Sequence, residues 1–178
     1  MSATSVHISA LDGIVNVNSL FTLAVFIGLT WNPTDPSNSL IDPSGCSAGP
    51  RIAEDLVAFH VYSFSCFLFS SLVALGIKQA ARLARGAHQQ DHRHFWAFDL
   101  AHVNKTALRL GYVVSAVGSV TGSVFLMLAL VNVVQIKLGV LGCGTGAGHA
   151  YAAVVPLVTF VPAGLLIYVC FVFYAFTR

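Results

Sequence analysis

The chain has 178 residues, of which 56% are hydrophobic and only 9% are charged, and its mean hydropathy is +0.78. Soluble domains carry about 25% charged residues, so this composition excludes an ordinary soluble protein and indicates a membrane protein. The net charge of +2 is small and gives no indication of nucleic-acid binding.

Long apolar runs account for most of the sequence. Each run is long enough to cross the hydrocarbon core of a bilayer as a helix, which takes about 20 residues. The runs lie at about residues 11–31, 54–77, 107–136 and 150–176. The sequence therefore predicts an all-α membrane protein in which residues 1–178 form a single domain with four transmembrane helices.

Basic residues are concentrated between the second and third runs. Six of the nine Lys and Arg residues lie there, namely Lys78, Arg82, Arg85, Arg93, Lys105 and Arg109. Because Lys and Arg in short connections stay on the cytosolic side, residues 78–106 are predicted to be a cytosolic connection. An even number of spans then places both termini in the cytosol and the loops at 32–53 and 137–149 on the lumenal or outer side.

The first run carries polar residues at helical spacing in its first half. Asp12, Asn16 and Ser19 form a stripe, and Asn18 adjoins it. Polar side chains inside a membrane face a helix partner or water. Asp12, near the cytosolic end, and the three polar residues after it are therefore candidates for the lining of an ion path.

The second run opens with Glu54 and Asp55, for which two interpretations remain open. Acidic side chains stabilise the N-terminus of a helix, where the helix dipole is positive. In a ring of subunits, however, they would repeat around one axis at the lumenal mouth and select cations. Further along, His60 and Ser63 share a helix face. They would either line a pore or bond to the backbone and to neighbouring helices.

The third run has small residues three and four positions apart. They are Gly111, Ser115, Gly118 and Gly122, and the last two form a GxxxG pattern. Small residues let two helices approach closely in a membrane. We predict that this face contacts another helix, within or between subunits, and does not line a pore.

The fourth run is apolar on all sides, apart from Pro156 and Pro162, and is predicted to face lipid. In the loops, Cys46 and Cys143 fall one in each lumenal segment, where disulfides form. We predict a Cys46–Cys143 disulfide; the alternative is two free thiols.

No constellation of residues for catalysis or for a resident cofactor is found in the sequence, so an enzyme is not predicted. Four helices leave little interior for an ion path. Any such path is expected to lie between the subunits of a symmetric homo-oligomeric ring, around a central pore.

The stretch Leu11–Phe21, LDGIVNVNSLF, together with the four spans and the long histidine-containing cytosolic connection, resembles the plant WeiTsing-type proteins. The resemblance extends over the whole chain. It implies an endoplasmic-reticulum membrane protein that assembles as a homopentamer around a central pore. It also implies a calcium-permeable, cation-selective channel with a role in plant immunity.

The resulting hypothesis is a calcium-permeable cation channel of the endoplasmic reticulum whose partners are the lipid bilayer and further copies of itself. Glu54 and Asp55 are the first candidates for an acidic ring and Asp12 the second. Carboxylate oxygens suit calcium, which is a hard cation. The alternative is a four-span scaffold or adaptor without transport activity, in which the polar stripe of the first helix packs inside its own bundle.

Overall fold

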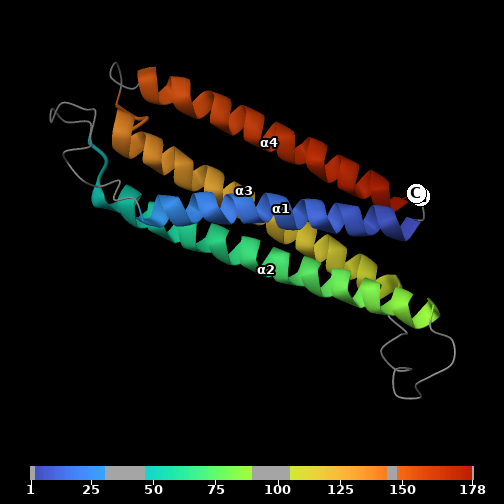
Figure 1. Cartoon of the computed structure of the whole chain (residues 1–178). Helices are drawn as coiled ribbons and strands as arrows, with labels where there is room; N and C mark the ends of the chain where they lie inside the picture. Colours follow the sequence, from blue (N-terminus) through green and yellow to red (C-terminus); the bar gives the residue numbers. More distant parts are fainter. Residues whose placement is uncertain (1–2, 31–46, 90–104, 144–147, 178) are drawn as a thin grey trace.

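The computed structural model describes residues 3–30, 47–89, 105–143 and 148–177. These residues form four helices: α1 (Ala3–Thr30), α2 (Pro50–Gln89), α3 (Lys105–Leu138) and α4 (Gly148–Thr177). The helices alternate in direction, so that the start of α1 and the end of α4 lie at the same end of the bundle (Figure 1).

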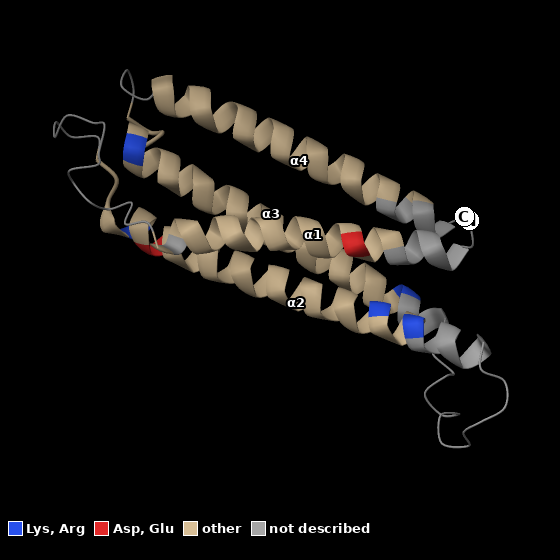
Figure 2. Ribbon diagram, in the orientation of Figure 1, with Lys and Arg blue, Asp and Glu red and all other residues tan. Residues whose placement is uncertain are grey.

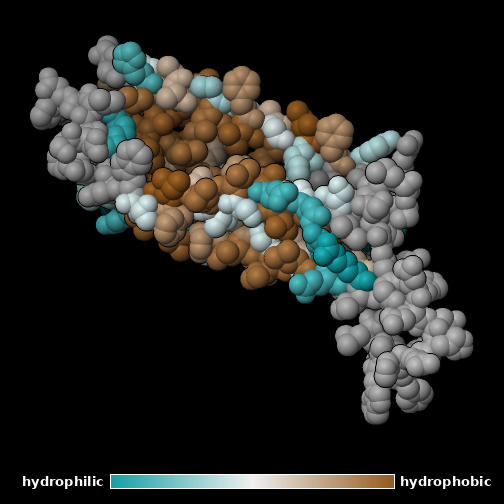
Figure 3. All heavy atoms as spheres, viewed as in Figure 1, coloured by the Kyte–Doolittle hydropathy of each residue, from teal (hydrophilic) through white to brown (hydrophobic). Residues whose placement is uncertain are grey.

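Each helix is long and apolar enough to cross a membrane. The candidate spans are Ser9–Gly28, Pro50–Arg82, Arg109–Leu138 and Gly148–Phe171. Charged residues gather toward the two ends of the bundle (Figure 2), and hydrophobic side chains cover the middle of the visible face (Figure 3). The predicted multi-pass, all-helical membrane fold is confirmed for the described part of the chain.

The two ends of the bundle differ in their residues. We call the end that carries Lys78, Arg82 and Arg109 the basic end. The other end carries Cys143, which is disulfide-bonded, and we call it the disulfide end. The predicted partner, Cys46, lies outside the described residues. Cys66 and Cys170, inside α2 and α4, are free thiols.

The helices α2 and α3 form the most extensive contact, α1 packs on α2, and α4 packs chiefly on α3. One hydrophobic cluster lies toward the basic end and contains Leu11, Ile14, Ala74 and Tyr112. A second cluster lies toward the disulfide end and contains Val25, Phe67 and Leu126. Both clusters draw residues from α1, α2 and α3, so the core is a three-helix core.

Small residues allow α2 and α3 to approach closely. A Cβ atom placed on Gly118 would lie 3.1 Å from Ser70 Cβ, and one placed on Gly122 would lie 2.9 Å from the Phe67 ring. Gly111 likewise faces Ile77 of α2. The small-residue face of α3 therefore forms a helix contact inside the subunit.

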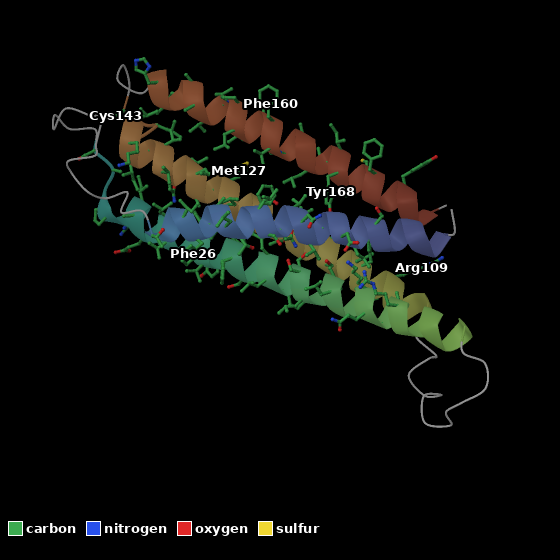
Figure 4. All side chains as sticks on the ribbon, viewed as in Figure 1. Phe26, Arg109, Met127, Cys143, Phe160 and Tyr168 are labelled. Carbon is green, nitrogen blue, oxygen red and sulfur yellow. The ribbon has the colours of Figure 1, made fainter. Side chains whose placement is uncertain are left out.

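The helix α4 is peripheral. Only 6% of its apolar segment is buried, compared with 39% for that of α3. Its large side chains, such as Phe160, point outward (Figure 4). Tyr168 is an exception, because it packs against the cluster at the basic end. The helix α4 therefore presents most of its surface to the outside of the bundle, and its contact with lipid stays a prediction.

Candidate functional site

Asn18 joins three helices through hydrogen bonds in the interior of the bundle. Its Nδ2 atom donates to Ser70 Oγ at 2.8 Å and to Ser71 Oγ at 3.2 Å, both on α2. Its Oδ1 atom accepts a hydrogen bond from Ser119 Oγ on α3 at 2.6 Å. The side chain is fully buried. Asn18 is thus the central residue of a polar layer between α1, α2 and α3.

Serine hydroxyls bond α2 to α3 directly. Ser70 Oγ donates to the Ser115 carbonyl at 2.6 Å, and Ser115 Oγ donates to the Ser70 carbonyl at 2.9 Å. Ser63 Oγ donates to the Gly122 carbonyl at 2.8 Å. Because α2 and α3 lie close enough for side chain to reach backbone, each hydroxyl is satisfied across the interface.

His60 fills the contact between α2 and α1. Its Nδ1 atom lies 2.8 Å from the Leu56 carbonyl, which can only accept, so Nδ1 carries the hydrogen. The other side of the imidazole packs against Gly28 so closely that a Cβ atom there would overlap Nε2. A glycine is therefore required at position 28 for α1 to approach the imidazole.

These contacts place three of the predicted lining residues inside the subunit. Asn18, His60 and Ser63 are all buried between helices of one subunit, with exposed fractions of 3% or less. Their polar atoms bond to their own bundle. In this structure they stabilise helix packing and do not face a path between subunits.

Asp12 forms an ion pair with Lys78 of α2, in which Lys78 Nζ donates to Asp12 Oδ1. The Asp12 side chain is 44% exposed, whereas the Lys78 side chain is only 17% exposed. The carboxylate predicted as a second acidic ring is therefore paired with a neighbouring ammonium, and its place on an ion path stays a prediction. From the sequence, Lys78 was predicted only to mark the cytosolic side of the membrane. The sequence does contain a signal for this pairing. If the first two spans are antiparallel, Asp12 at the start of one and Lys78 at the end of the other both lie near the basic end.

Asn16 and Ser19 remain on the outer surface of α1. Ser19 Oγ donates to the Val15 carbonyl of its own helix at 2.7 Å. Asn16 has no side-chain hydrogen bond to any described residue, although it lies inside the span that begins at Ser9. Together with the half-exposed Asp12, these residues form what we call the outer polar stripe of α1.

Glu54 and Asp55 are exposed near the start of α2, at the disulfide end. The helix begins at Pro50, so neither acid lies in its first turn. The dipole effect falls off within that turn, which weakens the interpretation of the acids as helix-stabilising residues. Consecutive helical residues point about 100° apart, so the two carboxylates face different directions.

No protein-family model, curated protein or solved structure matches this chain significantly. The resemblance to WeiTsing-type proteins therefore remains a prediction from sequence.

Proposed function

We propose that this chain is the subunit of a homo-oligomeric, calcium-permeable cation channel whose ion path runs between subunits. The observation that carries the proposal is Asn16, an exposed carboxamide inside a membrane span with no hydrogen-bond partner among the described residues. The resemblance adds the endoplasmic-reticulum membrane, a pentameric ring and a role in plant immunity to this proposal.

The interior of one subunit offers no polar passage among the described residues. Asn18 and the buried serines between α1, α2 and α3 are hydrogen-bonded within the bundle, and Gly118 and Gly122 bring α2 and α3 into direct contact. A path for hydrated ions must therefore lie outside the subunit.

The outer polar stripe of α1 is poorly suited to lipid. Burying an amide in an apolar medium without a hydrogen bond costs about 2–7 kcal/mol. Asn16 lies about 10 Å along the helix axis from Ser9, too deep for a short side chain to reach the membrane surface. Water in a path between subunits removes this cost, because it supplies donors and acceptors to Asn16 and to the exposed part of Asp12.

The acids at the disulfide end complete the proposal. Glu54 and Asp55 are exposed and form no ion pair with any described residue. Repeated around a ring, such carboxylates raise the local concentration of cations. Their oxygen atoms are the ligands that calcium prefers.

Currents through purified protein in planar bilayers test the proposal. We expect cation-selective current, a lower calcium-to-potassium permeability ratio in the Glu54→Gln/Asp55→Asn variant, and reduced conductance in Asn16→Leu. Ser65→Ala is a matched control, because Ser65 is also exposed in a span but already donates to the Val61 carbonyl at 2.9 Å. Absence of current from a well-folded oligomer would refute the channel.

A four-span scaffold is the second candidate, and the buried state of Asn18 favours it. One part of the polar stripe does pack inside its own bundle, as that alternative expects. Oligomer size in mild detergent separates the two candidates. A closed ring supports the channel, and a monomer or dimer supports the scaffold.

A further inference from the structure

The two side chains of the Asp12–Lys78 ion pair differ in how much of each is exposed. The lysine side chain lies largely inside the contact between α1 and α2, whereas nearly half of the aspartate side chain is exposed. The lysine bonds only to Oδ1. The remainder of the carboxylate is therefore left on the outer polar stripe, one helical turn from Asn16.

Asp12 is the only acid at the basic end among the described residues. The cations there include Lys78, Arg82 and Arg109, and both of these arginines are exposed. Arg82 follows Lys78 by one turn of α2 and forms no ion pair with any described residue. The one charged residue of the outer polar stripe, Asp12, is thus paired with Lys78.

We propose that Lys78 is a selectivity-determining residue, which rests on the channel function proposed above. By pairing with the Asp12 carboxylate, its ammonium keeps the outer polar stripe of α1 close to neutral where the stripe reaches the basic end. Cation selectivity then resides at the opposite end of the bundle, with Glu54 and Asp55. Removal of the ammonium alone would expose one uncompensated carboxylate per subunit and create a second acidic ring.

The test compares single-channel currents of four variants and one control variant with those of the wild type. In Lys78→Gln we expect cation conductance at low salt to rise about two- to fivefold, and the increase to shrink in 1 M salt, where charges are screened within about 3 Å. In Asp12→Asn we expect conductance to fall, because Lys78 is left uncompensated. The double variant should return to the wild-type value, and Lys78→Arg should retain it.

Arg82→Gln is the matched control, since it removes an exposed cation one turn away that has no carboxylate partner in the described structure. An equal rise in this variant, or no change in Lys78→Gln, would overturn the role of Lys78 while leaving the channel intact. If Lys78→Gln does not assemble, the conductance of Asp12→Asn becomes the test. An unchanged conductance in Asp12→Asn would overturn the role of Lys78. No current from assembled wild-type protein would instead refute the channel itself.

Discussion

Replacement of Asn18 by leucine tests the polar layer directly. Leucine has the same number of side-chain heavy atoms and the same branching as asparagine, so the substitution removes hydrogen bonds without leaving a cavity. Asn18 is fully buried and makes three side-chain hydrogen bonds to α2 and α3. The variant therefore isolates the contribution of these bonds to the attachment of α1.

The expected loss follows from the number of bonds. Side-chain hydrogen bonds between transmembrane helices contribute about 0.6 kcal/mol on average and about 1.7 kcal/mol at most. Three bonds give a loss of about 2 kcal/mol, or about a 30-fold change in the folding equilibrium. The freed serine hydroxyls of α2 and α3 limit the loss, because they can bond back to their own helices.

Reversible unfolding in mixed micelles, followed by circular dichroism, measures this loss. The matched control is Asn16→Leu, the same substitution two positions away on the outer surface of α1. We expect it to change the free energy of unfolding of the subunit by less than about 0.5 kcal/mol. Equal losses in the two variants, or no loss for Asn18→Leu, would refute the assignment of Asn18 to the interior.

Three glycines give further predictions. Gly118→Val should destabilise the contact between α2 and α3 by about 2 kcal/mol through overpacking, whereas Gly164→Val, on open α4 surface, should be nearly neutral in the same unfolding assay. Gly28→Ala should displace the imidazole of His60 and destabilise the subunit, and it should do so much less in a His60→Ala background. Gly139 ends α3 with a φ of 99°, so Gly139→Ala should cost about 1–2 kcal/mol; an unchanged midpoint of unfolding would contradict this reasoning.

The sequence was sufficient to predict the four helices, because every helix that crosses a bilayer needs a hydrophobic segment of about 20 residues. Hydrophobic length locates a span without knowledge of its neighbours. The ends of the helices were less predictable. The helix α2 starts at Pro50, before the apolar run, because proline suits the first helical position and the chain there need not be apolar.

The side chains that face the interior were harder to predict. Asn16 and Asn18 are chemically identical, yet they point about 200° apart on the helix. Which of them is buried depends on where α2 packs against α1. The polar pattern of α1 alone does not show where that contact lies. The small residues of α3 did indicate a close contact, but they did not identify α2 as the partner.

The sparse packing of α4 has a consequence for how its sequence can vary. Its outward side chains are exposed on the surface of the bundle. If they face lipid as predicted, one large apolar residue can replace another there. The selective pressure on α4 is then on the length of its hydrophobic segment, Gly148–Phe171, which at about 36 Å exceeds a typical bilayer core of about 30 Å. We expect homologues from membranes of different thickness to lengthen or shorten α4, while Ala150, Val154 and Tyr168 keep their identities.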